Sequence, residues 1–456
     1  FNFTGKRFFE WALILPLAIP PYILAYTFTG LFDSFGDANN AVRYLFNLNP
    51  DVSVFPNVRN IYGAIIVFGF TLYPYVYLVC RSSFINQSKS MKEAGRLLGL
   101  NQFHLFLKLG IPLIRPALIG GLMLVIMETL SDFGAVDHFA VQTFTTGIFR
   151  TWYGLYDIQT AMQLASLLLV TIGVFYLIER NSRVGIYSAN NAKFAPNNES
   201  DLLGYKAFLA FMICFIPLFI GFFLPLIELL LWAFEVNLEF FSGKFLENAF
   251  NTFMLSLGTG LICAALALCI NYSIRIDSGI FLKRMSSLLS IGYAVPGLIL
   301  AVGMVQLFIY LETYTSGIDL ILTGSIFGLL TAYVIKTYAL ANSSIESDYE
   351  RISFSIDDSS KLLGTTGWNM LRKVHTPLLK TSILTSVLLV MSDVVKELPA
   401  TLILRPFNFE TLAVSTYIYA SEERMTQAAA PAIAIVLTGL IPIIFLSKMI
   451  RSSRNI

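Results

Sequence analysis

Four acidic residues occupy matching positions in two apolar segments of the sequence, where carboxylates could guide a cation. They are Glu128, Asp132, Asp393 and Glu397. The first pair lies 16 and 20 residues after Pro112, and the second pair lies 16 and 20 residues after Pro377. Side chains four residues apart share a helix face, and ionisable groups inside an apolar segment are costly unless they line a polar cavity or find partners. Because carboxylate oxygens suit hard cations, whereas soft metals favour sulfur ligands, the four acids predict a transient cation path.

Simpler interpretations of these acids stay open. They could reach the aqueous interface at the ends of their helices, or pair locally with Lys396 or Arg405. His138, next to Asp137, is a further candidate metal ligand, although a lone histidine in a loop more often has a structural role. No Cys/His cluster in the sequence has the spacing of a metal site. Four cysteines in or at the ends of apolar runs are expected to be buried thiols without disulfides: Cys80, Cys214, Cys263 and Cys269.

The segments that carry the acids are long and apolar enough to cross a membrane. Of the 456 residues, 56% are hydrophobic and 13% are charged, and the mean hydropathy is +0.69. A soluble domain would be about 25% charged, so the composition predicts an all-α polytopic membrane protein. Apolar runs near the ~20 residues needed to cross a bilayer predict ten spans, at about 9–32, 60–80, 112–134, 160–178, 207–234, 250–274, 285–310, 320–340, 377–395 and 427–447.

Lysine and arginine predict the orientation of these spans, because cytoplasmic loops carry an excess of both. The loops on one side hold 21 of the 31 basic residues, and the loops on the other side hold 6. The first side, which includes residues 81–111, 341–376 and the C-terminus, is therefore expected to be cytoplasmic.

The two halves of the sequence share a pattern that indicates an internal repeat. Thirteen positions separate Gly99 from Pro112, and thirteen separate Gly364 from Pro377, and each glycine follows a Leu-Leu pair. The second half has two more spans ahead of the shared part than the first half has. The simplest inference is a tandem duplication of a six-helix unit, with the first two helices absent from this sequence; a natural asymmetry is the alternative. The expected divisions are a first repeat over 1–180, a cytoplasmic linker over 181–205 and a second repeat over 206–456.

Residues 86–108 are a polar segment between two spans, with a regular pattern of apolar and basic residues. The sequence predicts a short helix pair on the cytoplasmic face, with leucine and phenylalanine on one side and basic residues on the other. Gly99 would break or bend the helix, because glycine disfavours helix interiors. A single such segment could be an amphipathic loop that rests on lipid headgroups. Two copies at equal spacing, each ahead of a proline that begins a span, favour a docking element.

The same segment resembles the "EAA" coupling motif of ATP-binding-cassette importer permeases. The first copy presents Glu93, Ala94, Gly99 and Pro112 at the motif positions. The second copy departs from the pattern, since Asp358 and Ser359 replace the glutamate and alanine ahead of Gly364 and Pro377. In that family the segment forms a coupling helix that sits in a cleft of a cytoplasmic ATPase, so the resemblance implies the same role for both copies. The substitutions keep charge and size but weaken the expectation for the second copy.

The sequence around the acids resembles the fused, two-repeat permeases of ferric iron importers that depend on a periplasmic binding protein. The stretches concerned are 127–150 and 396–406, and the resemblance covers essentially the whole chain. It implies a permease of the type I importer kind, and it assigns Glu128, Asp132, Asp393 and Glu397 to the path of ferric iron as transient ligands. Thiamine permeases share the fused architecture, so thiamine or another small solute is an alternative cargo.

The resemblance also implies partners. Two copies of an ABC ATPase subunit would dock through residues 86–108 and 351–373, and a loaded periplasmic binding protein would meet residues 135–158 and 401–426. The sequence contains no G-x-x-x-x-G-K-[S/T] motif, so we expect ATP on the partner subunit, no tightly bound cofactor and no enzymatic activity of the chain itself. The expected location is the bacterial inner membrane, with many spans in the lipid bilayer and a cytoplasmic C-terminus; no nucleic-acid partner is expected.

A function of another class is an ion-coupled secondary transporter, in which the acids would bind protons or sodium. Both halves of this sequence are predicted to share one topology, whereas many secondary carriers use inverted repeats. Uptake driven by an ion gradient without an ATPase would support this alternative.

Overall fold

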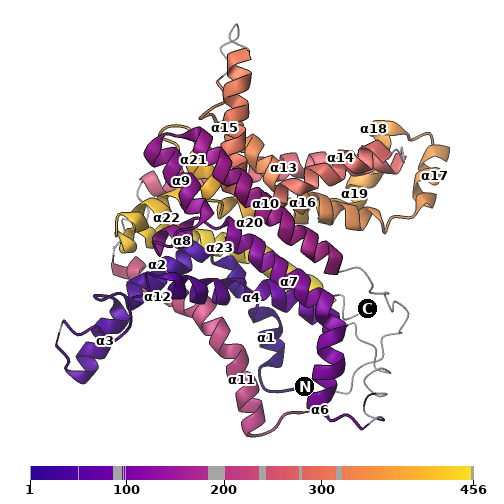
Figure 1. Ribbon diagram of the computed structural model, residues 1–456. Coiled ribbons are helices and arrows are strands. Elements are labelled where there is room, and N and C mark those ends of the chain that lie inside the picture. Colours follow the sequence, from indigo (N-terminus) through magenta and orange to yellow (C-terminus); the bar gives the residue numbers. More distant parts are fainter. Residues whose placement is uncertain are drawn as a thin grey trace. The chain divides into compact units, whose positions relative to one another are not determined.

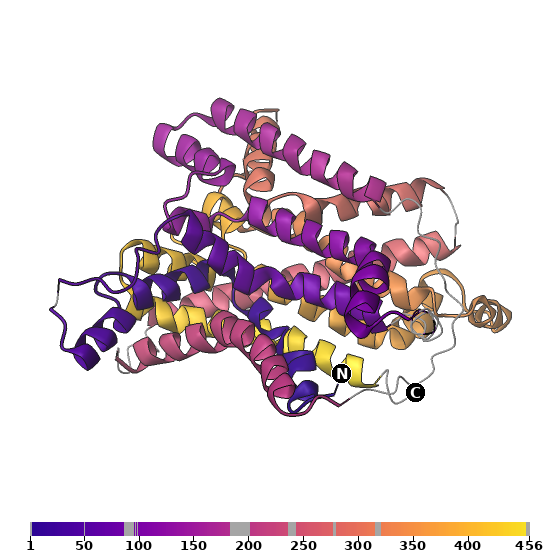
Figure 2. The ribbon, with the colours of Figure 1, turned by 60° about the horizontal axis from the view of Figure 1, so that its bottom comes forward.

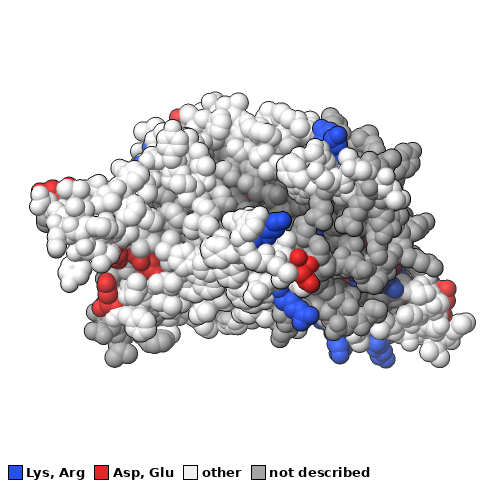
Figure 3. All heavy atoms as spheres, turned by 90° about the horizontal axis from the view of Figure 1, so that it is seen from below, with Lys and Arg blue, Asp and Glu red and all other residues white. Residues whose placement is uncertain are grey.

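The protein is built from helices, as the sequence predicts. The computed structural model describes residues 2–49, 51–85, 95, 97, 99–182, 201–235, 243–276, 280–314 and 321–452, and in these ranges it contains helices and loops but no strand (Figure 1). On the face shown in Figure 3, most of the described surface carries neither basic nor acidic side chains, as expected for helices that face lipid. The predicted all-α polytopic fold is confirmed.

The described helices offer seven to nine membrane spans, against the ten predicted. Seven single helices are long and apolar enough, and two bent helix pairs raise the number to nine if each pair is one span. The seven are Ile61–Ile85, Phe103–Ser131, Ile158–Phe175, Tyr205–Glu235, Gly243–Ile276, Gly297–Tyr314 and Met425–Ile444. The predicted span 320–340 corresponds to α16 (Ile326–Tyr349), which is long enough but carries several polar side chains that find partners within the protein, such as Lys336 and Asn342.

Two compact units divide the described chain. One contains residues 1–146 and 163–228, and the other contains residues 147–162 and 229–456. The units are defined by contacts, and they differ from the predicted repeats in two segments: residues 147–162 belong to the second unit, and residues 206–228 belong to the first. The boundaries of the repeats stay a prediction. Each unit is described by itself below.

The first unit is organised around α4 (Ile61–Ile85) and α7 (Ile111–Ser131), which pack along each other (Figure 1). Gly121 of α7 approaches Val76 of α4 so closely that a Cβ would lie 2.8 Å from the Val76 Cα. Small residues permit such close helix contacts within a membrane. Helix α2 (Pro21–Phe32) packs against α4 and against the short helix α8 (Gly134–His138).

The second unit is organised around three helices that pack against one another: α13 (Gly243–Ile276), α16 and α20 (Lys380–Val395) (Figure 2). Gly260 of α13 brings the backbone of α20 close, since a Cβ there would lie 3.0 Å from the Val387 carbonyl oxygen. Buried small side chains such as Cys263 and Ala341 fill this core. Two further helices, α22 (Leu412–Ser421) and α23 (Met425–Ser452), pack against each other.

The same order of elements follows the motif glycine in both copies. In the first copy, the helix α6 (Gln102–Leu105) and a π-helical turn over Phe106–Gly110 precede α7. In the second copy, the helix α18 (Gly367–Met370) and a π-helical turn over Leu371–His375 precede the short helix α19 (Thr376–Leu378). Each of these helix pieces begins three residues after its motif glycine. The expected prolines, Pro112 and Pro377, stand in the first turn of α7 and α19, where the missing N–H is tolerated.

All four cysteines are free, so the expected absence of disulfides is confirmed. Cys263 is buried within the protein, and Cys80, Cys214 and Cys269 are half-buried in helices of the apolar runs.

Candidate functional site

The second copy of the motif forms a well-defined helix, α17 (Phe354–Leu362), just beyond the end of α16 (Figure 1). Ser353 caps its start by accepting a hydrogen bond from the Ser355 N–H. Gly364 ends it in the left-handed region, at φ +74°. The N–H of Thr365 donates to the Ser360 carbonyl at 2.9 Å, and the N–H of Gly364 donates to the Lys361 carbonyl at 3.0 Å. This is the hydrogen-bond pattern of a Schellman C-cap.

The outer face of α17 exposes large apolar side chains beside the motif residues. Leu362 is 89% exposed and Leu363 is 85% exposed. The motif residues Asp358 and Ser359 are exposed on the same helix, and the Asp358 carboxylate pairs with Lys361 at 3.7 Å. Exposed apolar side chains next to polar groups are typical of a surface that contacts another protein or a membrane.

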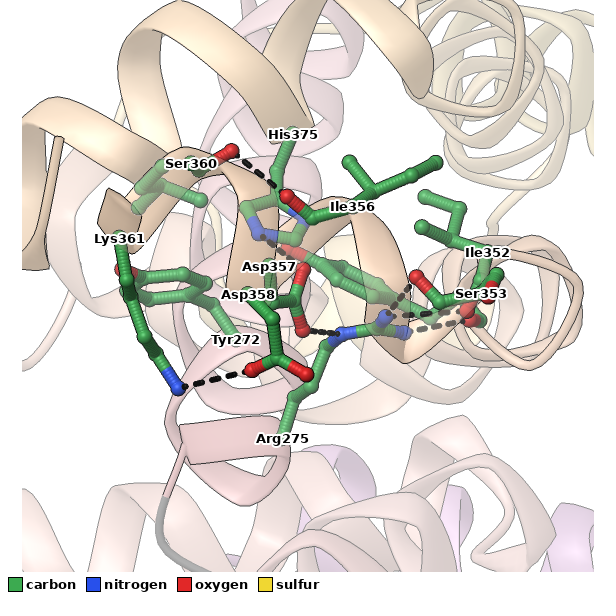
Figure 4. Close-up of polar contacts among 12 residues, drawn as sticks. Tyr272, Arg275, Ile352, Ser353, Ile356, Asp357, Asp358, Ser360, Lys361 and His375 are labelled. Atoms are coloured by element: carbon green, nitrogen blue, oxygen red, sulfur yellow. Dashed lines mark hydrogen bonds and ion pairs between the residues drawn. The ribbon is translucent and has the colours of Figure 1, made fainter. Parts of the chain in front are cut away.

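The inner face of α17 is held by a buried ion pair. The guanidinium of Arg275, in the last turn of α13, donates from Nε to Oδ2 of Asp357 at 2.6 Å (Figure 4). It also donates to the carbonyls of Tyr349 at 3.0 Å, Ile352 at 2.9 Å and Ser353 at 3.1 Å. Only 7% of the Arg275 side chain and 9% of the Asp357 side chain are exposed. One planar fork therefore joins α13, the end of α16 and the first turn of α17.

His375 lies on the other side of Asp357. Its Nε2 is 3.3 Å from Oδ1 of Asp357, an approach that is not aligned as a hydrogen bond. The imidazole is fully buried between two aromatic rings, with centroids 5.2 Å away for Tyr272 and 5.5 Å away for Tyr349. Tyr272 in turn donates from its hydroxyl to the Gly367 carbonyl at 2.6 Å. Figure 4 shows Asp357 between Arg275 and His375, while Asp358 points away toward Lys361.

The first copy of the motif shows the same helix ending. Gly99 has φ +79°, and the N–H of Leu100 donates to the Gly95 carbonyl at 3.1 Å, as the N–H of Thr365 does to the Ser360 carbonyl. Leu97 is 88% exposed, like Leu362 in the second copy. The predicted docking residues Glu93 and Ala94 lie outside the described residues.

The acids of the first unit have defined polar partners. The Tyr75 hydroxyl donates to Oε1 of Glu128 at 3.3 Å. Asp132 ends α7, and its Oδ1 accepts the N–H of Ala135 at 2.9 Å and the N–H of Val136 at 3.2 Å. The Asp132 carboxylate thus caps the start of the short helix α8, which is a structural role. A role in a cation path would have to be compatible with these hydrogen bonds.

The acids of the second unit are paired with lysines. Glu397 is buried, accepts the Ala400 N–H at 3.3 Å and forms an ion pair with Lys336 of α16. Asp393 pairs with Lys396 at 3.3 Å, as the simpler interpretation from the sequence had it. The other local partner considered, Arg405, is instead directed toward Glu410 at 3.9 Å.

Metal ligation by these four acids stays a prediction. Two acids belong to each unit. Within the described ranges, no group of three or more His, Cys, Asp or Glu side chains is arranged to hold a metal ion. A path that binds its cargo only in passing needs no such permanent cluster.

The surroundings of His138 favour its structural interpretation. Nε2 lies 2.8 Å from the Thr29 hydroxyl oxygen, and that hydroxyl donates to the Ala25 carbonyl at 2.9 Å, so the imidazole is the donor. Burial, with a smaller contribution from the charge of Arg59, lowers the pKa of His138 to about 3. The ring is therefore neutral at physiological pH, and its Nε2 proton is engaged.

Three residues of this site were missed from the sequence: Arg275, Asp357 and His375. A signal for Asp357 was present, since an acid three positions before Ser360 shares the inward face of a short helix with it. Arg275 and His375 belong to other elements, and only the fold brings them to Asp357.

Comparisons with known proteins match this chain to transport components. Residues 1–181 match the family described as "Binding-protein-dependent transport system inner membrane component". The chain is 25% identical to the Fe(3+)-transport system permease protein FbpB 2 of Haemophilus influenzae, over 98% of this chain and 84% of the relative. It is 24% identical to the putative molybdenum transport system permease protein YvgM of Bacillus subtilis, over 32% of this chain and 65% of the relative.

Among solved structures, the chain is similar to a chain of a bacterial alginate ABC transporter in complex with an alginate pentasaccharide-bound periplasmic protein. The TM-score is 0.42 at 18% identity, and the match covers 52% of this chain and 91% of the other.

Proposed function

We propose that this chain, whose residues 1–181 match the family of binding-protein-dependent transport system inner membrane components, is the membrane-spanning permease of an ATP-driven ferric iron importer. The observation that carries the importer class is the duplicated docking segment. Both copies end a helix at a left-handed glycine, Gly99 or Gly364, and both expose a leucine beside it. The Fe(3+) permease relative, similar over nearly the full chain, supports the cargo.

The partners follow from this proposal. Two copies of a cytoplasmic ABC ATPase subunit bind through residues 86–108 and 351–373, and ATP binds to those subunits, since this sequence has no ATPase motif of its own. A periplasmic binding protein delivers the cargo to residues 135–158 and 401–426. The chain lies in the inner membrane of a bacterium with its C-terminus in the cytoplasm, holds no tightly bound cofactor and performs no chemistry itself.

In the proposed cycle, the docking segments transmit movements of the ATPase subunits to the membrane helices. ATP binding closes the ATPase dimer and moves both segments, which opens the outer gate of the permease. The binding protein then releases ferric iron past the carboxylates of Glu128, Asp132, Asp393 and Glu397, which are hard oxygen ligands for a hard cation. Hydrolysis returns the inward-facing state.

Uptake of radioactive iron into vesicles that contain the chain, an ATPase subunit and a loaded binding protein tests this proposal. We expect iron uptake to require ATP on the side of the membrane where the ATPase subunit is bound. Replacing the acids singly by amides should lower uptake at least tenfold, while binding of the ATPase subunit is retained. Asp132→Asn is well suited to this test, because the amide oxygen can still cap α8 and only the charge is lost. Asp201→Asn, an exposed acid hydrogen-bonded to Asn2, is the matched control.

Two outcomes would contradict the proposal in different ways. Uptake driven by an ion gradient without an ATPase would make the chain a secondary transporter. ATP-dependent uptake of thiamine or another solute, with none of iron, would keep the mechanism and replace the cargo.

A further inference from the structure

The outer face of α17 carries the residues proposed to contact the ATPase subunit. The inner face carries a buried ion pair and takes no part in that proposed contact. Asp358 and the exposed leucines point outward, whereas Asp357 is buried against Arg275 (Figure 4). We propose that Arg275 is a positioning residue that ties the docking helix to the membrane helices, so that a movement of α17 is transmitted instead of absorbed in its loops. This inference rests on the proposed function of the chain.

Arg275 is placed to do this because its bonds spread over separate elements. Its guanidinium leaves the last turn of α13 and donates to the end of α16 at Tyr349, to the connecting turn at Ile352 and Ser353, and to Asp357 of α17. Its Cζ also lies 4.5 Å from the ring centroid of Phe354, the first residue of α17. A cation over an aromatic face adds to the fixation. The loop between α16 and α17 is short and is bonded at each end, so it has little freedom to flex.

The same cluster reaches the helix that carries one of the proposed cation ligands. Asp357 faces His375 through its second oxygen, and His375 ends the π-helical turn directly before α19 and α20. Near its far end, α20 bears Asp393. Along its length α20 packs against both α13 and α16. A displacement of α17 therefore acts on α13 through Arg275 and on α20 through His375, within one packed unit.

The anchor belongs to the second copy of the motif. The position of His375 at the end of its π-helical turn is taken in the first copy by Gly110, which has no side chain that could reach a carboxylate. The two docking segments share their glycine ending, and in the described part of the first segment the His375 contact has no counterpart.

The test measures iron uptake and ATP hydrolysis in the same vesicles, with the full chain, the ATPase subunit and the binding protein. Arg275→Lys keeps the positive charge but loses the planar fork that bonds several carbonyls at once. We expect this variant to bind the ATPase as the wild type does and to hydrolyse ATP, while the number of iron ions imported per ATP falls at least fivefold. Asp358→Asn, on the opposite face, is the control. It should weaken ATPase binding and lower uptake and hydrolysis together, with their ratio unchanged.

A second variant distinguishes a role of the ion pair in stability alone from a role in transmitting the movement of α17. Replacing both charges, as in Arg275→Met with Asp357→Leu, removes an ion pair without leaving one buried charge alone, a change that often preserves stability. If this double variant folds and also regains the wild-type ratio of uptake to hydrolysis, the pair serves stability alone and the inference fails. An unchanged ratio in Arg275→Lys overturns it as well. Absence of ATP-driven uptake in the wild type would instead overturn the proposed function, and this inference with it.

Discussion

Lys336 and Glu397 form a buried ion pair at a junction of three helices. Lys336 belongs to α16, and Glu397 precedes α21 (Pro399–Leu404), whose Ala400 N–H it accepts. Gly297, the first residue of α15 (Gly297–Tyr314), lies against both charged groups. The acid that the sequence places in a cation path is thus already neutralised by a lysine in this structure. In the first unit, Asp132 accepts the corresponding N–H, that of Ala135.

The ion pair predicts a strong dependence of stability on both partners. Glu397→Gln would remove the Glu397 charge from the half-buried Lys336 ammonium, and the loss should not exceed the ~3–5 kcal/mol typical of breaking a fully buried pair. Replacing both residues, as in Lys336→Met with Glu397→Gln, should recover most of that loss. Thermal unfolding in detergent measures both variants. A double variant that folds well but does not import iron would support a role for Glu397 in the path, whereas one that imports normally would restrict Glu397 to stability.

Two glycines of α15 provide a matched pair of variants. A Cβ at Gly297 would overlap Oε1 of Glu397 and lie 3.1 Å from the Lys336 Nζ, so Gly297→Ala should separate the ion pair. A Cβ at Gly303 meets nothing within 4 Å. Gly303→Ala should therefore stabilise the helix by about 0.5–1 kcal/mol, the usual gain over glycine in a helix interior. Unfolding midpoints that move in opposite directions would confirm the prediction, and equal shifts would contradict it.

The sequence predicted the elements of this protein better than their contacts. Apolar runs identify the helices because a span must hide its backbone from lipid, and the spacing of Gly99 and Gly364 from their prolines identifies the repeat, whose local structure recurs in both copies. The match of residues 1–181 to a family of transport components agrees with the family resemblance. Among the described residues, the predicted span 320–340 is not one of the candidate spans, because α16 carries polar side chains such as Lys336 and Asn342, which find partners inside the protein.

The candidate site was harder to predict because its bonds join distant parts of the chain. Asp358 was assigned from the motif and its neighbour Asp357 was passed over, although the structure exposes the first carboxylate and buries the second. Arg275 looked like an ordinary basic residue of a cytoplasmic loop. Its role follows from the packing of α13 beside α16, which places its guanidinium among three carbonyls and a carboxylate.

Gly364 predicts a local requirement for glycine in the docking segment. Its φ of +74° is left-handed, while the space around it is open, so a side chain there would be strained without any clash. Gly364→Ala should cost about 1–2 kcal/mol in that conformation, and Gly364→Asn should cost less, since asparagine tolerates it. Because α17 is a short surface helix, the loss should appear as weaker ATPase binding, measured by co-purification, with little change in global unfolding. Equal binding of wild type and Gly364→Ala would contradict the prediction.

His138 predicts how the first unit responds to acid. Its pKa of about 3 in the folded state lies below the value of about 6.5 expected in the unfolded chain. Between these values the unfolded chain binds a proton that the folded state does not, so stability should fall as the pH decreases below about 6.5, by about 1.4 kcal/mol per unit. Above that pH the imidazole is neutral in both states and contributes no slope.

The variant His138→Gln isolates this contribution. The glutamine amide can still donate to the Thr29 hydroxyl, which His138 Nε2 meets at 2.8 Å, but it does not titrate. Unfolding of both proteins in detergent between pH 7.5 and pH 4.5 should show wild type losing stability faster than the variant as the pH falls, so that their difference shrinks or reverses at low pH. A difference that stays constant over this range would mean that the imidazole is not held neutral by its burial.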